Sequence, residues 1–168
     1  FSEFAHRPSE QFGVNLSLRI DKADGFEERI TGRLGVEYQS GNARFFVSGG
    51  EGFKLPSFYA LGHALVGNAD LKPETSRNVE AGVEWQGEKS EVSVSAFRSD
   101  YDNLINFDPM IFRLVNESDV RSEGMEFAAK FKPSALASIA VNATYVDVMI
   151  EGGGSLLQRP DWRLGFNA

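Results

Sequence analysis

Residues 52–84 read GFKLPSFYALGHALVGNADLKPETSRNVEAGVE, and this stretch decides the fold of the chain. A predicted strand ends near Gly52, a long loop follows, and a new strand starts near Thr75. Pro56 at the start of the loop and Pro73 at its end each fix φ at about −65° and restrict the preceding residue. Between the two prolines lie four residues that favour turns, Gly62, Gly67, Asn68 and Asp70.

The strand that follows the loop alternates in polarity at every residue. Val79, Ala81, Val83 and Trp85 share one face, and Asn78, Glu80, Gly82 and Glu84 share the other. Because successive strand side chains point to opposite sides of a sheet, this pattern predicts a strand with one apolar and one polar face. A packed soluble core cannot bury such a polar row unless each charge is paired, so the polar face is expected to contact water.

The same alternation occurs along most of the chain and predicts an all-β fold, an antiparallel up-and-down meander of about eight strands with no convincing helix. Further strands are expected at 14–21, 31–39, 43–50, 92–96, 120–132, 139–145 and 161–167, with short β segments near 103–107 and 112–115. Residues 1–12 are expected to be irregular. The alternation fails at Phe97 and Arg98, which indicates a β-bulge or the exit from the buried zone.

Short and long connections alternate along the predicted meander. The short ones lie at 40–42, 86–89 and 132–135, and the long ones at 51–74, 102–118 and 151–159. Outer-membrane barrels have short turns on one rim, long loops on the other and aromatic girdles at both interfaces. Aromatic residues lie near strand ends on the apolar face here, namely Tyr38, Trp85, Phe131, Tyr145 and Trp162. These patterns favour an arc of a transmembrane β-barrel, and a soluble sheet with one solvated face is the alternative.

The composition excludes several classes of protein. The 168 residues include no cysteine, which excludes disulfides and thiolate metal sites. The net charge of −7 argues against nucleic-acid binding as the main task. No run of about 18 apolar residues occurs, so no transmembrane helix is expected. A barrel strand needs only about 9–11 residues with every second one apolar, so the absence of such a run does not exclude a membrane β-barrel.

No enzyme or cofactor motif accompanies these strands. The sequence lacks the HExxH and GxSxG patterns, and its two histidines, His6 and His63, lie far apart in predicted irregular segments. Carboxylates are plentiful, but no pair is singled out by its position. We therefore expect no catalytic residues, no metal site and no bound cofactor.

Three linked motifs resemble the barrel domain of TonB-dependent outer-membrane receptors. They are GFKLPS at 52–57, GNADLKPETS at 67–76 and EAG at 80–82, and they stand in the order found in that family. The segment VRSEGME at 120–126 is similar to a further strand motif of the family. The residues that carry the resemblance, all expected to be structural, are Gly52, Phe53, Pro56, Asn68, Leu71, Pro73, Glu74, Glu80, Gly82, Gly124 and Glu126. Glu80 and Glu126 are expected to make lumen-side contacts or salt bridges to a plug domain.

The resemblance implies a large barrel of about 22 strands in the outer membrane of a Gram-negative bacterium. Such receptors import iron–siderophore complexes, haem, cobalamin or glycans with energy relayed by TonB. The implied partners are outer-membrane lipid, the plug domain of the same full-length chain, TonB and a small-molecule nutrient. Residues 1–168 are then expected to be part of such a barrel, without its plug and terminal strands, with two unpaired edges.

The substrate itself is not encoded in these motifs. Four residues in the two central loops, Tyr59, His63, Asp70 and Phe112, are candidates for contact with substrate by position alone. Two other functions compete with the receptor. One is a small self-closed or soluble β-barrel that binds a ligand without TonB, which would place its apolar row inside and polar residues outside. The other is a porin-like or adhesin-like barrel without TonB coupling.

Overall fold

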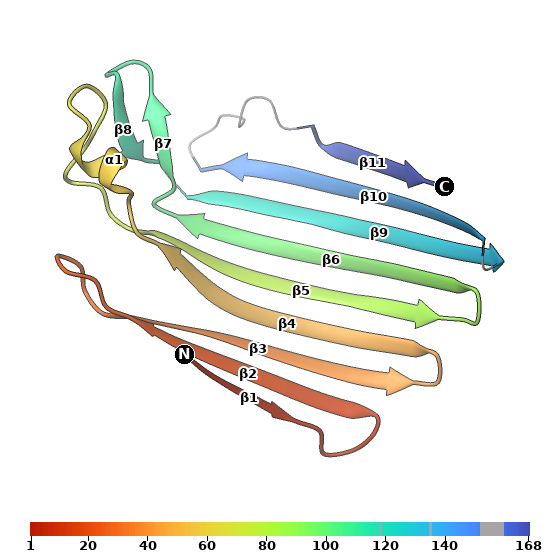
Figure 1. Ribbon diagram of the computed structural model, residues 1–168. Coiled ribbons are helices and arrows are strands. Elements are labelled where there is room, and N and C mark those ends of the chain that lie inside the picture. Colours follow the sequence, from red (N-terminus) through yellow and green to blue (C-terminus); the bar gives the residue numbers. More distant parts are fainter. Residues whose placement is uncertain (118, 135, 152–159) are drawn as a thin grey trace.

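The computed structural model describes residues 1–117, 119–134, 136–151 and 160–168. Its main element is a nine-stranded antiparallel sheet, β1-β2-β3-β4-β5-β6-β9-β10-β11 in spatial order (Figure 1). The strands are β1 (Ser2–His6), β2 (Phe12–Asp21), β3 (Arg29–Ser40), β4 (Ala43–Lys54), β5 (Glu74–Gln86), β6 (Ser90–Asp102), β9 (Val120–Ser134), β10 (Ala137–Ile150) and β11 (Trp162–Asn167). The strands β7 (Ile105–Asp108) and β8 (Arg113–Asn116) form a separate hairpin, and a short helix, α1 (Phe58–Gly62), precedes β5.

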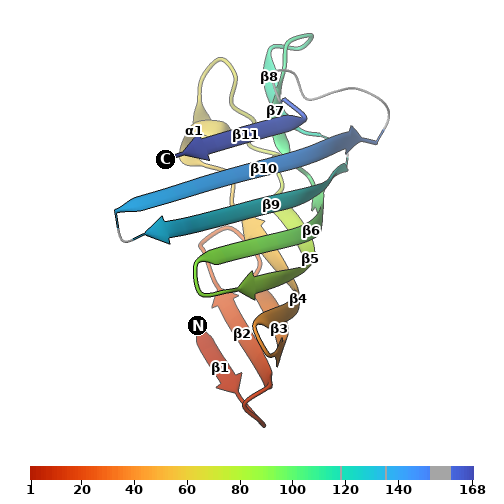
Figure 2. The same cartoon turned by 90° about the vertical axis from the view of Figure 1, so that its right-hand side faces the viewer.

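The sheet is an open, curved arc. The predicted antiparallel meander is confirmed, with nine strands in the sheet where about eight were expected. The two short β segments predicted between 102 and 118 are also present, as β7 and β8. Strands β1 and β11 form the two margins of the arc, and within the described residues each pairs with one neighbour (Figure 2).

The connections separate into a short-turn end and a loop end, as predicted. Residues 41–42 and 87–89 make short turns at one end, whereas residues 55–73 and 103–119 form long connections at the other. The predicted turn at 132–135 is shorter than expected, because β9 continues to Ser134, which pairs with Ala137. The predicted long connection at 151–159 lies, apart from Glu151, outside the described residues.

Two elements were missed by the sequence analysis. The expectation that residues 1–12 are irregular is wrong, because β1 pairs along its length with β2 and places Phe4 opposite Leu16. A five-residue strand whose two apolar residues, Phe4 and Ala5, are adjacent gives almost no period-two signal, and its hydrogen bonds to β2 define it. The expectation of no helix is also wrong. Helix α1 is a single turn capped by Ser57, whose hydroxyl accepts a hydrogen bond from the Ala60 N–H, and one turn is too short to show periodicity.

Of the two alternatives predicted at Phe97 and Arg98, the bulge is wrong, since β6 pairs with both β5 and β9 without a register shift. The other alternative, the exit from the apolar zone, agrees with Arg98 following Ala96 on the apolar face. Phe97 belongs to the polar-face row, where it lies opposite Glu80 on one side and Gly124 on the other. A Cβ atom placed on Gly124 would lie 2.5 Å from Cζ of Phe97. The ring therefore occupies the space that the glycine leaves above the sheet. The described register shift lies elsewhere, between Ala137 and Ile139.

The same packing of an aromatic ring over a glycine explains the family-signature residue Gly82 in β5. Phe46 interrupts the polar row of β4 and lies opposite Gly82. A Cβ atom on Gly82 would lie 2.7 Å from Cζ of Phe46 and 2.7 Å from the carbonyl oxygen of Val94. Gly82 and Gly124 are thus positions where a neighbouring ring and a neighbouring backbone approach too closely for a side chain.

Within the described part of the chain, no second layer covers the apolar face of the sheet. Val79 on this face is 57% exposed and Phe131 is 48% exposed. Among the described residues, the buried apolar side chains are Pro56, Ala60, Leu71 and Val120. The chain therefore has alternating faces without the enclosed core of a soluble β-sandwich.

The apolar band on this face crosses the rows of paired residues obliquely. Its border pairs, from the short-turn end to the loop end, are Phe12 with Tyr38 and Ile20 with Ile30 in β2–β3, and Phe131 with Ile139 and Met125 with Tyr145 in β9–β10. The intervening registers show that the band in β9–β10 is displaced toward the short-turn end. Strands in closed barrels tilt by about 35–45° to the barrel axis. On a barrel with tilted strands, an apolar layer that lies at one depth in the bilayer crosses the rows of paired residues obliquely, as the band does here.

Candidate functional site

The loop end carries a folded cap made of two segments distant in sequence. We call residues 55–73, which include α1, and residues 103–117, which include the β7–β8 hairpin, the loop cap (Figure 1). The Asn68 side chain donates from Nδ2 to the Leu114 carbonyl oxygen at 2.9 Å, and the Leu114 N–H donates to the Val66 carbonyl oxygen at 2.8 Å. Arg113 Nε donates to the Gly67 carbonyl oxygen at 3.2 Å. These bonds join the two loops directly.

A second asparagine holds the base of the loop cap. Oδ1 of Asn116 accepts a hydrogen bond from the Lys72 N–H at 2.8 Å. Its Nδ2 group donates to the carbonyl oxygens of Lys72 at 3.0 Å and Asn103 at 2.7 Å. Asn103 has a positive φ of 58°, a conformation that asparagine tolerates better than most residues. The sequence analysis did not identify Asn116, because nothing near it in sequence indicates its partners.

Several family-signature residues lie at this junction. Leu71 and Pro56 are buried within it. Glu74 Oε1 accepts the Ile105 N–H at 2.9 Å, and its Oε2 accepts a hydrogen bond from Lys54 Nζ at 3.1 Å. The Asn68 Oδ1 atom also accepts the Asp70 N–H at 3.0 Å, which closes the local turn. The signature GNADLKPE thus supplies side chains that fasten the loop cap to the ends of β4 and β5.

The remaining signature residues begin and end the flanking strands. Gly52 pairs with Ser76 and Phe53 pairs with Thr75 where β4 approaches the loop cap. A Cβ atom on Gly52 would lie 3.0 Å from Ser76 Oγ, which is a tight contact. Pro73 directly precedes β5. These residues lie at strand ends, and their structural roles stay a prediction.

The four candidate substrate residues do not form one cluster. The rings of Tyr59 and His63 lie 4.5 Å apart between centroids, so these two are brought together. His63 Nδ1 accepts the N–H groups of Leu65 and Val66, each at 3.3 Å, which gives this ring a role in the turn. Phe112 instead packs edge-on against Phe107, with centroids 5.2 Å apart.

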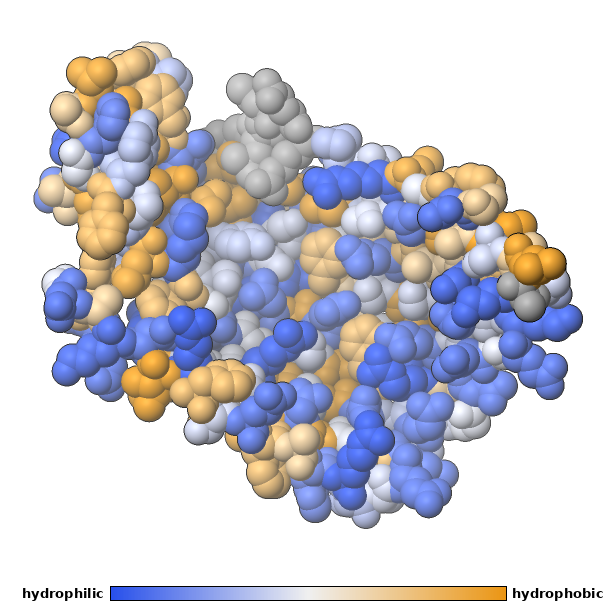
Figure 3. All heavy atoms as spheres, viewed as in Figure 1, coloured by the Kyte–Doolittle hydropathy of each residue, from blue (hydrophilic) through white to orange (hydrophobic). Residues whose placement is uncertain are grey.

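Asp70 lies on the exposed turn next to Asn68 and makes the backbone contact described above. The loop cap also exposes large apolar side chains, the most exposed being Phe58 at 96% and Met110 at 91%. Leu65, Ile111 and Phe112 are exposed as well. Figure 3 shows hydrophobic residues gathered over the loop cap at the upper left of the molecule.

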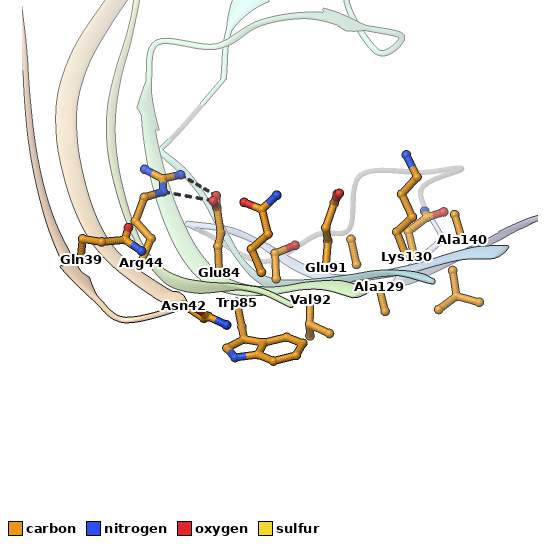
Figure 4. A pocket seen from close by; sticks show the side chains of 15 residues that line it. Gln39, Asn42, Arg44, Glu84, Trp85, Glu91, Val92, Ala129, Lys130 and Ala140 are labelled. Atoms are coloured by element: carbon orange, nitrogen blue, oxygen red, sulfur yellow. Dashed lines mark hydrogen bonds and ion pairs between the residues drawn. The ribbon is translucent and has the colours of Figure 1, made fainter. Parts of the chain in front are cut away.

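The polar face forms the concave wall of the arc. Figure 4 shows Arg44, Glu84 and Lys130 pointing into the curve of the sheet, while Trp85 and Val92 point away from it. A hollow of about 550 Å³ lies on this wall near the short-turn end. A soluble barrel would have the reverse arrangement, with its apolar row inside and polar residues outside.

An arginine network crosses the concave wall beside this hollow. Arg44 donates from Nη2 to Glu84 Oε1 at 2.6 Å and from Nε to Glu84 Oε2 at 3.1 Å, a bidentate pair. Its Nη1 donates to Glu37 Oε2 at 3.0 Å, and Glu37 Oε1 accepts from Arg7 Nη2 at 2.8 Å. The guanidinium carbon of Arg44 lies 5.3 Å from the centroid of the Phe46 ring. The network ties β3, β4 and β5 to the connection after β1.

The sequence analysis placed these residues in the polar row but did not pair them. Their pairing depends on the register of three strands, and Arg44 lies 40 residues from Glu84. A signal was available in the tight turn at 40–42, because it fixes the β3–β4 register and brings Glu37 and Arg44 to the same region.

Glu80 and Glu126 both lie on the concave wall. Glu80 faces Ser48 and Phe97 across the strands, and Glu126 faces Ser95 and Thr144. Within the described residues neither carboxylate has an ion-pair partner. Their position agrees with the expected lumen side, and their salt bridges to a plug domain stay a prediction.

Two kinds of element are absent from the described residues. No group of three or more histidine, aspartate or glutamate side chains is arranged to hold a metal ion. No helix in the part of the chain that the structure describes is long and apolar enough to cross a membrane.

Comparison with known proteins agrees with this architecture. The family model for TonB dependent receptor-like β-barrels matches residues 1–168. The vitamin B12 transporter BtuB of Vibrio vulnificus (strain YJ016) is 29% identical over 160 residues, which is 92% of this chain and 26% of the transporter.

Two solved structures share the fold. The siderophore receptor PirA from Pseudomonas aeruginosa superposes with a TM-score of 0.76 at 26% identity, covering 84% of this chain and 29% of PirA. The copper transporter OprC has a TM-score of 0.74 at 15% identity, covering 89% of this chain and 28% of OprC, which shows the fold alone. The chain thus spans just over a quarter of the length of these relatives. The match over its whole length shows that this chain belongs to the family of TonB-dependent receptor-like β-barrels.

Proposed function

We propose that residues 1–168 form one arc of the barrel of an outer-membrane receptor that imports a scarce nutrient with energy relayed by TonB. The oblique apolar band carries this proposal, because tilted strands that cross a bilayer require it. The polar concave wall gives the arc a water-facing interior. The long connections at one end supply a surface where a ligand is first met.

The two ends of the arc have different roles in this proposal. The loop cap lies at the outer end and contributes to nutrient capture, with Tyr59, His63, Asp70 and Phe112 near the substrate. The concave wall faces the plug domain of the same full-length chain, with Glu80 and Glu126 among its contacts. TonB acts through that full-length receptor.

The nutrient is an iron–siderophore complex or a similar scarce compound, such as cobalamin, haem or a glycan. The relative BtuB is a vitamin B12 transporter and PirA is a siderophore receptor, so both classes occur among similar proteins. The exposed aromatic and aliphatic side chains of the loop cap suit a ligand with flat or apolar parts.

Uptake by the full-length receptor that contains this chain tests the proposal. The receptor is expressed in a Gram-negative host that lacks its own siderophore and cobalamin receptors, with and without TonB. We expect the protein in the outer membrane, and accumulation of a radiolabelled ferric siderophore or cyanocobalamin only when TonB is present. Recovery of the receptor in a soluble fraction would contradict the membrane placement. Equal uptake without TonB would contradict active transport and favour a porin-like barrel.

A further inference from the structure

His63 lies at the start of a tight turn in the loop cap, directly after helix α1 (Figure 1). Its main-chain N–H donates to the Tyr59 carbonyl oxygen at 3.0 Å, and its carbonyl oxygen accepts the Gly67 N–H at 2.8 Å. A Cβ atom on Gly67 would lie 2.5 Å from both the main-chain nitrogen and the carbonyl oxygen of His63, so the two backbones are in close contact. We call residues 63–67 the histidine turn.

The imidazole of His63 fastens the histidine turn through one atom. Nδ1 accepts the N–H groups of Leu65 and Val66, each at 3.3 Å. These donors follow His63 by two and three residues, which is the spacing at which an Asn or Asp side chain accepts in an Asx turn. Because a ring nitrogen that accepts hydrogen bonds carries no proton, the ring is uncharged and has its proton on Nε2. The turn thus requires one tautomer of the neutral ring.

The histidine turn also holds the second segment of the loop cap. The carbonyl oxygen of Val66 accepts the Leu114 N–H at 2.8 Å, and that of Gly67 accepts a hydrogen bond from Arg113 Nε at 3.2 Å. Directly after the turn, the Asn68 N–H donates to the Ala60 carbonyl oxygen at 2.8 Å. The position of β8 relative to α1 therefore depends on the shape of the turn.

The described surroundings of His63 offer nothing that would stabilise a proton on Nδ1. Residues 58–69 contain no Asp, Glu, Lys or Arg, and among the ion pairs of the described residues none includes His63. On α1 the Tyr59 ring faces the imidazole, and it attracts an imidazolium without offering Nδ1 an acceptor. On the second segment the facing charged group is the cation Arg113. Asp70 lies beyond Asn68 on the exposed turn.

We propose that His63 is a pH-sensitive positioning residue of the loop cap, an inference that rests on the proposed role of the cap in nutrient capture. Histidine is the residue that ordinarily changes its charge between pH 5 and 8. Protonation puts an N–H group on Nδ1, where it meets two main-chain N–H groups that need an acceptor. The histidine turn then opens, and its carbonyl oxygens lose their partners on β8. Because the loop cap faces the external medium, capture weakens as that medium becomes acidic.

Amide exchange of the full-length receptor, in detergent and without nutrient, tests the turn itself. Protection is compared near pH 8 and near pH 5, after correction for the intrinsic exchange rates. Peptides that contain Leu65, Val66 or Leu114 should lose protection by about tenfold near pH 5, the size expected for the loss of one or two hydrogen bonds. His6→Asn changes the other histidine of this chain, on β1, and should leave this pH dependence unchanged.

Two substitutions of His63 separate protonation from packing. Asn carries its acceptor oxygen on the γ carbon, where Nδ1 stands in histidine, whereas the oxygen of Gln lies one bond farther out. His63→Asn should therefore keep the protection at both pH values, and His63→Gln should lose it at both. Gly67→Ala opens the turn by steric contact and should also lose protection at both. The heat-dependent mobility of each variant on gels reports whether its barrel has assembled.

Nutrient binding connects the turn with capture. The probes are a radiolabelled ferric siderophore and radiolabelled cyanocobalamin. The affinity of the wild type for the probe that it binds should fall by about tenfold between pH 8 and pH 5, in parallel with the exchange. The same ratio of affinities measured in His63→Asn should show no such fall.

The remaining outcomes contradict the proposal or one of its parts. Equal protection of the wild type at the two pH values would overturn it, and so would a loss of protection near pH 5 in His63→Asn. Full protection in His63→Gln would show that Nδ1 does not hold the turn. A pH-dependent turn with pH-independent binding would refute the connection with capture. Failure of both probes to bind at either pH would refute the proposed nutrients alone, because the exchange measurement needs no nutrient.

Discussion

The ladder of strands and the loop cap are stabilised in different ways. In the ladder, each strand repeats the same main-chain pairing over as many as 13 residue pairs, so the loss of one contact leaves many others. In the loop cap, three hydrogen bonds of the Asn68 and Asn116 side chains connect segments that are 44 to 46 residues apart in sequence. A fourth bond joins Asn116 to the carbonyl oxygen of Asn103. Stability is therefore distributed in the ladder and concentrated in the loop cap. We therefore expect the ladder to be disrupted by changes to the polarity or packing of its two faces. The loop cap should be disrupted by the loss of single side chains.

The largest effect is expected from a charge on the lipid face of the ladder. Phe127→Asp places a carboxylate in the middle of the apolar band on β9. Near the bilayer centre a charged Arg or Lys costs about 2–4 kcal/mol, and an Asp costs somewhat less. Outer-membrane levels of the full-length receptor should fall to a small fraction of wild type. Trp85→Asp, nearer the short-turn border, should have a smaller effect in the same direction.

Ala128→Asp is the matched control, since Ala128 is the next residue along β9 and faces the concave wall. Its assembly should be close to wild type. Normal levels of Phe127→Asp, measured by blotting of membrane fractions, would show that the two faces are wrongly assigned.

A smaller effect is expected where the ladder has no room for a side chain. Gly124→Ala places a Cβ atom against the Tyr145 carbonyl oxygen and the Phe97 ring, and overpacking of this kind costs about 1–3 kcal/mol. The midpoint of unfolding of the full-length receptor by urea in detergent should decrease. Gly35→Ala is the comparison, because the three atoms nearest its Cβ would all belong to the movable side chain of Asn15. Equal midpoints for the two variants would contradict the role of ring-over-glycine packing.

The loop cap should respond differently from the ladder. Asn116→Ala removes the partner of the Lys72 N–H and of two carbonyl oxygens, and an unsatisfied polar group costs about 1–3 kcal/mol where it is buried. We expect faster amide exchange across residues 60–73 and 103–117, with normal barrel assembly. Asn106→Ala loses a 3.3 Å contact with Glu117 and a 2.9 Å bond from the Phe107 N–H, but no bond between the two loop segments. It should change exchange little beyond Phe107 itself. Protection that is unchanged in Asn116→Ala would show that the loops are held by other contacts.

The smallest effect is expected from the arginine network on the concave wall. Arg44→Gln loses the bidentate pair with Glu84, and exposed ion pairs contribute about 0.2–1 kcal/mol. The urea midpoint should fall slightly at low salt and match wild type at high salt, because salt screens exposed charges. Arg33→Gln, which loses one 3.4 Å contact with Ser48, is the comparison. A large loss that persists at high salt would show that the network is not merely electrostatic.

The parts of the fold that repeat with period two were predictable from sequence. Strands such as β5 were identified because Val79 to Trp85 alternate without a break, and the tight turns fixed their neighbours. Strand β1 and helix α1 were not, since five residues give too few repeats for either period. The sequence left a bulge at Phe97 as one of two alternatives, because the partner of Phe97, Gly124, lies on a strand whose register cannot be derived from the sequence.

The candidate site was predictable only in part. The signature residues Asn68 and Glu74 were identified by resemblance, and their contacts to Leu114 and Ile105 emerged from the structure. Asn116 had no local signal, because its partner Lys72 is 44 residues away in sequence.

The asparagine bonds between the two segments of the loop cap have a consequence for exchanging loops between receptors. Residues 55–73 and 103–117 each depend on the other for backbone hydrogen-bond partners. A graft of one segment into a related barrel leaves its asparagine facing a foreign loop. The two segments therefore form a single cassette, to be transplanted, randomised or inherited together. Recombination within residues 74–102 would separate them and should yield fewer functional chimaeras than recombination on either side.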